Sequence, residues 1–183
     1  MADLRVLFCG NSYTFFHGMP QIVQQFAASR PGCHRLDFEM IAPGGCTLER
    51  HWEETGAAEA ISRGAWDCVV LQEQSTRPIE DPGLMFRYAR LLHREAQRVQ
   101  ARAVLFLTWA RRDAPEAQRE LTAAYRTIAR ELGATVAPVG IAWQTVLRKR
   151  RDLPLHEDDG SHPNHAGAYL TACVFYATLF DAS

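Results

Sequence analysis

The sequence lacks an excess of either charge, and it lacks the clustered basic face that a nucleic-acid-binding domain needs. Its 183 residues include 20 Lys and Arg against 21 Asp and Glu, a formal net charge of −1. The one basic run is Arg148-Lys149-Arg150-Arg151, interpreted as a solvated helix end where cations suit the negative pole of the helix dipole. No nucleic-acid partner is therefore expected.

Long apolar runs and paired cysteine motifs are also missing. No apolar run reaches the roughly 18–20 residues of a membrane span. Met1-Ala2-Asp3 leads into a strand without the apolar segment and cleavage site of a secretory signal. The five cysteines include no C-x-x-C pair, which argues against a disulfide framework or a zinc knuckle, and Cys68 and Cys173 are expected in the core. The sequence predicts a reduced, cytoplasmic protein with no membrane partner.

What the sequence does contain is a regular alternation of apolar strand-like runs and helical patterns. With 47% apolar residues, the chain is expected to form a single domain over residues 1–183. The alternation predicts an α/β fold: a three-layer α/β/α sandwich around a flavodoxin-like, five-stranded parallel sheet in the order 2-1-3-4-5. Expected strands cover residues 5–9, 36–42, 68–71 (continuing into 72–75), 103–108 and 135–138. Expected helices cover 20–28, 47–62, 82–99, 115–132, 141–148 and about 164–180.

A serine follows the first predicted strand. Gly10-Asn11 form a turn there, and Ser12 comes next. In open α/β sheets the strands end along one rim, where ligands bind. A serine on that rim is a candidate nucleophile if a base removes its proton. His162 is the candidate base, since an imidazole ordinarily titrates near neutrality, and Asp159 is close enough in sequence to contact its Nδ1.

Attack of a serine on an ester creates an oxyanion, which needs hydrogen-bond donors already in place. Two candidates are the backbone N–H groups of Ser12 and of Gly45, which follows the second strand. The third is the side-chain amide of Gln74, which follows the third strand, with Gln72 as the alternative. These three strands are neighbours in the predicted order, so their ends surround one crevice.

This ordered set of motifs resembles the SGNH (GDSL-like) serine hydrolases, most closely their GNS-type branch. The likeness extends over nearly the whole chain. The family commonly has G-D-S in its first block and G-x-N-D in its third, so Asn11 and Gln74 depart from the pattern, and Gln74 is one methylene longer than the usual asparagine. The matching blocks are Gly10-Asn11-Ser12, Gly44-Gly45-Cys46-Thr47, Gln72-Glu73-Gln74-Ser75 and Asp159-Gly160-Ser161-His162.

The resemblance implies a serine esterase that acts on small O-acyl esters, with acetylated carbohydrates as candidate substrates. It implies a catalytic triad of Ser12, His162 and Asp159, and an oxyanion hole formed by Ser12, Gly45 and Gln74. It implies no cofactor and no metal, and a small-molecule ester as the partner. The G-x-S-x-G elbow of the larger α/β-hydrolases is absent. The oligomeric state stays open.

Two other functions remain open. The altered third block also fits a domain of this fold that binds a carbohydrate or another small ligand with little or no catalysis. A metal-dependent hydrolase is the other, because imidazoles and carboxylates gather before the last helix, although no H-E-x-x-H motif is present. These potential ligands are His156, Asp158, Asp159, His162 and His165.

Several single residues also have two interpretations. Asp158 is an alternative to Asp159 as the partner of His162. Cys46 is a weaker candidate nucleophile, since no base is evident near it. Six residues just past the strand ends line an acyl or sugar pocket, or else belong to the core and its rim: Tyr13, Phe15, Phe16, His17, Trp109 and Arg111.

Overall fold

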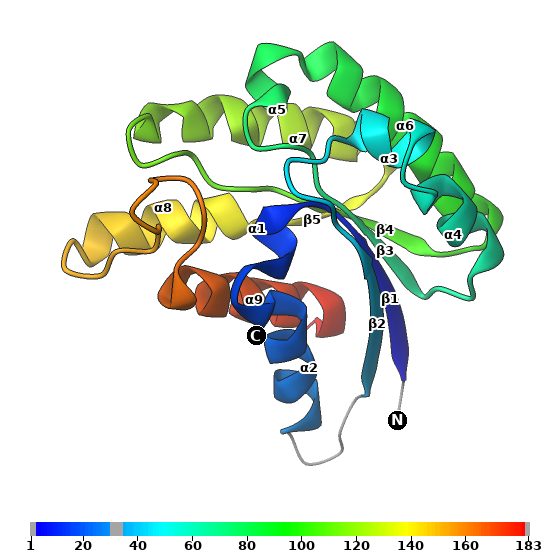
Figure 1. The fold of residues 1–183 in the computed structure, drawn as a ribbon, viewed down its shortest axis with the longest axis horizontal. Coiled ribbons are helices and arrows are strands. Elements are labelled where there is room, and N and C mark those ends of the chain that lie inside the picture. Colours follow the sequence, from blue (N-terminus) through cyan, green and yellow to red (C-terminus); the bar gives the residue numbers. More distant parts are fainter. Residues whose placement is uncertain (1–2, 30–34, 182–183) are drawn as a thin grey trace.

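The computed structural model describes residues 3–29 and 35–181 (Figure 1). Within them one parallel sheet has the order β2-β1-β3-β4-β5, which confirms the predicted order 2-1-3-4-5. All four strand pairs are parallel, so every strand ends on the same rim of the sheet. The strands are β1 (Leu4–Cys9), β2 (Leu36–Ile41), β3 (Cys68–Leu71), β4 (Arg102–Phe106) and β5 (Thr135–Ala137).

Alternate residues of the central strands bury opposite faces of the sheet. Leu7 and Leu105 belong to the apolar cluster on one face, whereas Phe8 and Phe106 belong to the cluster on the other. The first face is covered by α3 (Leu48–Glu53), α4 (Ala57–Arg63), α6 (Pro82–Arg98) and α7 (Gln118–Leu132). The second is covered by α2 (Met19–Ala28), α8 (Val139–Lys149) and α9 (His165–Phe180) (Figure 1). The predicted three-layer sandwich is therefore confirmed.

The prediction of one helix over residues 47–62 is wrong. The chain forms α3 and α4 instead, separated by a bend at Thr55-Gly56. Gly56 has a φ of +75°, the left-handed conformation that glycine adopts without steric cost. Thr47 nevertheless caps α3 as predicted, because its hydroxyl accepts a hydrogen bond from the N–H of Arg50 at 3.2 Å.

Three short helical turns were not predicted from the sequence, a fourth forms the first turn of the helix predicted over 115–132, and β3 ends at Leu71 without continuing into residues 72–75. Turns of three or four residues are set by individual hydrogen bonds and leave no periodic pattern to detect. They are α1 (Ser12–Phe15), η1 (Phe16–Gly18), α5 (Arg77–Glu80) and η2 (Pro115–Ala117).

The last helix, α9, lies between α2 and α8 and contacts both. The absence of charged side chains in it led to the prediction that most of its surface is buried. Its sheet-facing side is buried, with Phe175 packed edge-on against Phe8 and Phe106, whereas Tyr169 is 55% exposed. Within residues 3–29 and 35–181, none of the helices has both the length and the apolar character that crossing a membrane requires.

Candidate active site

The turn that presents Ser12 is built by the two residues before it. Any side chain at Gly10 would place its Cβ 2.3 Å from Thr14 Oγ1, so the close approach requires glycine. Asn11 caps α1: its Oδ1 accepts the N–H of Tyr13 at 3.1 Å. Its Nδ2 also donates to the carbonyl of Cys46 at 3.0 Å, a bond that an aspartate cannot make. The asparagine that departs from G-D-S therefore ties the Ser12 turn to the loop after β2.

Gln72 is fully buried behind this turn. Its Oε1 accepts from Asn11 N at 3.0 Å and from Thr14 Oγ1 at 2.7 Å, while its Nε2 donates to Asn11 Oδ1 at 2.7 Å and to the carbonyl of Glu73 at 3.1 Å. With its amide group engaged inside the protein, Gln72 positions Asn11 and offers nothing to a ligand. The alternative assignment of Gln72 as an oxyanion donor therefore finds no support in the geometry.

Ser12, His162 and Asp159 lie in one chain of hydrogen bonds. Ser12 Oγ is 2.9 Å from His162 Nε2, and His162 Nδ1 is 2.5 Å from Asp159 Oδ2. Asp159 Oδ1 accepts the backbone N–H groups of Ser161 and His162. The hydrogen bond from His162, followed by that from the Ser161 N–H, lowers the pKa of Asp159 to about 2. Asp159 is therefore a carboxylate throughout the physiological pH range, and Asp159, not Asp158, contacts the imidazole.

The loop that carries His162 is held from several sides, and Figure 1 shows it next to α1. Trp109 Nε1 donates to the carbonyl of Ser161 at 3.0 Å, and the Tyr13 hydroxyl is 2.7 Å from Ser161 Oγ. The Phe16 ring stacks on the imidazole of His162 with 4.4 Å between ring centroids. These contacts fix the position and the plane of the imidazole opposite Ser12.

Two backbone donors are free at this rim. Gly45 lies in the loop after β2, is exposed and has a φ of +64°. Across the described parts of the chain, no hydrogen bond engages the backbone N–H of Ser12 or of Gly45. Both groups thus lack a partner among the described residues, whereas buried backbone N–H groups are nearly always paired.

Gln74 has a structural task at the same rim. Its Oε1 accepts the N–H groups of Thr76 at 2.8 Å and Arg77 at 3.0 Å, which supports the start of α5. Its Nε2 donates to Ser75 Oγ at 3.2 Å, and the second amide hydrogen has no partner in the part of the chain that the structure describes. The role of Gln74 as a third oxyanion donor stays a prediction.

Glu73 is a buried residue for which the sequence predicted no role. Its Oε1 accepts the N–H of Leu48 at 3.2 Å and that of Gln74 at 2.7 Å, so one carboxyl group links the loop after β2 to the loop after β3. Burial raises its pKa to about 7. The only sequence signal was a carboxylate two residues after a fully apolar strand, with no basic residue beside it.

His51, also overlooked in the sequence, is fully buried beneath the Ser12 turn. Its Nε2 donates to the carbonyl of Gly10 at 2.8 Å. Burial lowers the pKa of His51, so the neutral ring is favoured. Gly10 is therefore held by a side chain of α3.

The potential metal ligands before α9 point in different directions. His156 Nε2 donates to the carbonyl of Ala110 at 3.0 Å, and His165 lies against His17 with 3.9 Å between ring centroids. In residues 3–29 and 35–181, no three His, Cys, Asp or Glu side chains are grouped as a metal site would need. Cys46 is buried, and desolvation raises the pKa of its thiol, which disfavours the reactive thiolate.

The six residues past the strand ends divide between core and rim. Tyr13 and Trp109 are buried and stack on each other with 4.4 Å between centroids. Phe15 is partly exposed, and His17 pairs with Glu157 at 2.8 Å. Phe16 lies on the imidazole of His162, as described above, and Arg111 donates to Ser75 Oγ at 3.3 Å.

Comparison with solved structures shows that the fold is similar to SGNH and GDSL-like hydrolases. A candidate SGNH hydrolase from Slackia heliotrinireducens has a TM-score of 0.82 and 26% identity, covering 97% of this chain and 99% of that one. A candidate GDSL-like lipase from Parabacteroides merdae has a TM-score of 0.77 and 14% identity, covering 100% and 97%. A catalytic mutant of the acetylxylan esterase Axe2 from Geobacillus stearothermophilus has a TM-score of 0.75 and 16% identity, covering 98% and 95%.

No family model matches the sequence, and a search of curated proteins found no match. These three structural neighbours are described as hydrolases, one of them as an esterase and one as a lipase. Likeness at this level of identity establishes the shared fold. The GNS-type branch stays a prediction.

Proposed function

We propose that this chain is a serine esterase that hydrolyses small O-acyl esters without a cofactor, with acetyl esters of carbohydrates as its preferred substrates. The observation that carries the proposal is the hydrogen-bonded chain Ser12–His162–Asp159, whose two ends lie about 150 residues apart in sequence. A nucleophile, a base and a residue that orients the base are the three parts that activated-serine chemistry needs.

In the proposed reaction, Ser12 Oγ attacks the ester carbonyl carbon while His162 Nε2 takes the hydroxyl proton. The imidazolium that forms is stabilised by Asp159 through Nδ1–H. As the tetrahedral intermediate collapses, the bond to the leaving oxygen breaks, and His162 gives its proton to that oxygen. A water molecule, deprotonated by His162, then attacks the acyl-Ser12 ester and releases the acid together with the free serine.

The oxyanion of the intermediate would be bound by the free N–H groups of Ser12 and Gly45, with Gln74 Nε2 as the proposed third donor. Two buried side chains connect the loops that carry these donors. Asn11 joins the Ser12 turn to the loop of Gly45, and Glu73 joins the two loops that follow β2 and β3. Donors that are already oriented stabilise an oxyanion without reorganisation during the reaction.

A cavity beside Gly45 and Gln74, which Ser12, His162 and Asp159 do not line, favours a small, hydroxyl-rich substrate. It has a volume of about 370 Å³ and includes both Gly45 and Gln74 in its wall. Its other lining residues are mostly polar, which suits a sugar better than a long acyl chain. They are Thr47, Thr76, Arg77, Glu80 and Asp81.

The test is hydrolysis of p-nitrophenyl acetate and of acetylated sugars by the wild-type chain and by Ser12→Ala. A fluorophosphonate probe, which forms a bond only with an activated serine, should label the wild type and not the variant. Ser62→Ala, on the exposed face of α4, is the matched control and should behave as the wild type. Unchanged turnover in Ser12→Ala would overturn the proposal.

One observation favours a second function, a domain that binds a carbohydrate with little catalysis. The Gln74 oxygen is engaged with α5, which restrains the amide that would serve as third donor. Under this second function, the folded wild-type chain binds acetylated sugars but neither hydrolyses them nor reacts with the fluorophosphonate.

A further inference from the structure

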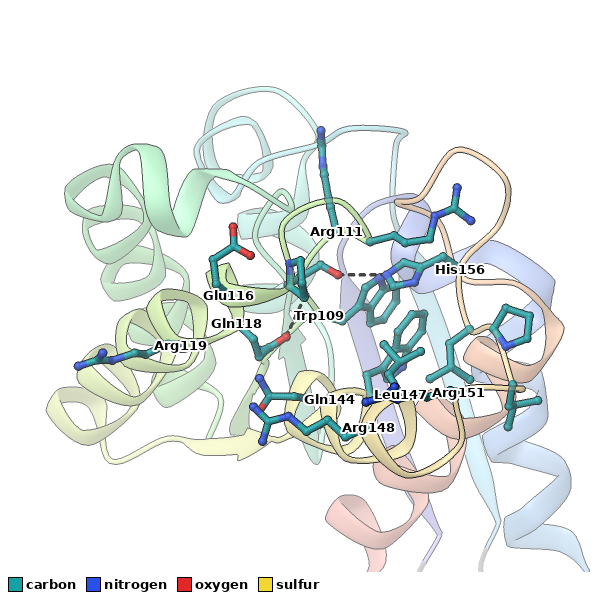
Figure 2. A pocket seen from close by; sticks show the side chains of 17 residues that line it. Trp109, Arg111, Glu116, Gln118, Arg119, Gln144, Leu147, Arg148, Arg151 and His156 are labelled. Carbon is teal, nitrogen blue, oxygen red and sulfur yellow. Dashed lines mark hydrogen bonds between the residues drawn. The ribbon is translucent and has the colours of Figure 1, made fainter.

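A second cavity is lined by residues of the loop that follows β4, of α8 and of the chain after α8 (Figure 2). It has a volume of about 720 Å³, and its lining residues come from segments 109–119, 143–151 and 153–156. Neither Ser12, His162 nor Asp159 lines it. Its volume lies within the range of small-molecule sites, about 300–1,000 Å³.

The surface of this cavity is mainly apolar. α8 contributes Leu147, with the fully buried Trp143 behind it, and the segment after α8 contributes Leu153 and Pro154. The ring of Trp143 stacks on Trp109 with 3.8 Å between centroids, so this wall is rigid. A rigid apolar wall favours an occupant with an apolar body.

The charge around the cavity is mostly positive. Five arginines line it, Arg111, Arg112, Arg119, Arg148 and Arg151, against the single carboxylate of Glu116. Figure 2 shows Arg111 and Arg119 extending away from the cavity, whereas Arg148 extends from α8 beside Gln144 and Arg151 lies near Leu147.

None of these five guanidinium groups has a carboxylate partner within 4.0 Å among the residues that the structure describes. Arginines elsewhere do pair: Arg150 bonds to Asp152 at 2.9 Å, although it belongs to the same basic run as Arg148 and Arg151. Clustered cations without partners repel each other, and a bound anion removes that repulsion. The run is thus more than a solvated helix end, because two of its members face a cavity.

We propose that this cavity binds an organic anion with an apolar body, of the type of a medium-chain carboxylate. The apolar body lies against Leu147, Leu153 and Pro154, and the carboxylate accepts charge-assisted hydrogen bonds from Arg148 and Arg151. The site is separate from the proposed esterase site. It adjoins that site through Trp109, which lines the cavity and also bonds to the loop of His162.

The test is isothermal titration calorimetry of the full chain with sodium octanoate at low ionic strength. Octanoate should bind at least about tenfold more tightly than octan-1-ol, which lacks the charge, and than acetate, which lacks the apolar body. The double variant Arg148→Gln/Arg151→Gln should weaken octanoate binding by about tenfold or more, with circular dichroism as the check on folding.

Arg150→Gln is the matched control, because Arg150 lies in the same run but outside the cavity, and it should bind octanoate as the wild type does. Ser12→Ala should also bind octanoate unchanged, which separates this proposal from the esterase proposal. Leu147→Glu, which places a carboxylate in the cavity, should abolish binding. The proposal is overturned if octanoate does not bind, if octan-1-ol binds equally well, or if Arg150→Gln weakens binding as much as the double variant.

Discussion

The sheet rim at Ser12 and the cavity at Arg148 differ in how their polar groups are satisfied. At the rim, four loops are connected by hydrogen bonds, and the backbone N–H groups of Ser12 and Gly45 have no partner among the described residues. In the cavity, guanidinium groups surround an apolar wall and have no carboxylate partners among the described residues. The fixed geometry of the rim suits the proposed reaction, and the charge and apolar area of the cavity suit the proposed binding.

The largest expected effect is at the nucleophile. Ser12→Ala should lower kcat for p-nitrophenyl acetate by about 10⁴-fold or more, because no other group there can form the acyl intermediate. The measurement is steady-state hydrolysis alongside the Ser62→Ala control. A small loss of kcat in Ser12→Ala would mean that Ser12 is not the nucleophile.

Asp159→Asn should be nearly as damaging, with kcat lower by about 10³- to 10⁴-fold, since the amide cannot stabilise an imidazolium. Because the pKa of Asp159 is lowered to about 2, its carboxylate stays ionised above about pH 3. The wild-type rate should therefore show no step from Asp159 between pH 4 and 9, which a pH–rate profile checks. Asp158→Asn is the matched control and should leave the rate nearly unchanged.

Gln74→Ala separates the two tasks of that residue. If its Nε2 binds the oxyanion, kcat should fall by about 10²-fold while KM changes little. If Gln74 only supports α5, the loss should appear in thermal stability with kcat nearly intact. Comparing kcat with the melting temperature of the same variant decides between them.

Glu73→Gln probes the link between the two donor loops and should change stability with a defined pH dependence. The folded-state pKa of about 7 lies above the ordinary 4.5, so the folded protein retains a proton that the unfolded chain loses between these values. Wild-type stability should therefore fall as pH rises through this window and then level off.

Glutamine keeps the Oε1 acceptor without this penalty. The advantage of Glu73→Gln should grow with pH to about 3 kcal/mol above pH 7, at about 1.4 kcal/mol per pH unit. Urea unfolding at pH 5 and pH 8 measures it. Glu120→Gln, on the exposed face of α7, should show no such trend, and an equal trend there would contradict the assignment to Glu73.

The smallest effect is expected in the cavity. Arg148→Gln/Arg151→Gln should leave the melting temperature unchanged or slightly raised, because it removes repulsion and breaks no ion pair. Arg90→Gln, which removes the bidentate pair with Glu131 on α6 and α7, should lower it slightly. An equal loss of melting temperature in both variants would mean that Arg148 and Arg151 have partners and are not available to bind a ligand.

Much of the site could be predicted from local sequence. Ser12, Gly45 and Asp159-x-x-His162 each lie next to a turn signal or a strand end, and the alternation of strands and helices predicts which strand ends meet. Gln72 shows the limit of this reasoning. Its residue type suits an oxyanion donor as well as Gln74 does, and only the direction of the side chain, buried against Asn11, assigns it a structural task.

The sequence by itself determined the layered fold, the strand order and the candidate nucleophile and base, because apolar periodicity and turn residues act locally and strands of one direction share a rim. Only the tertiary structure decided that Glu73 joins two loops and that half of a basic run borders an apolar cavity. Those relations depend on the directions of side chains from elements distant in sequence, and packing, not propensity, sets those directions.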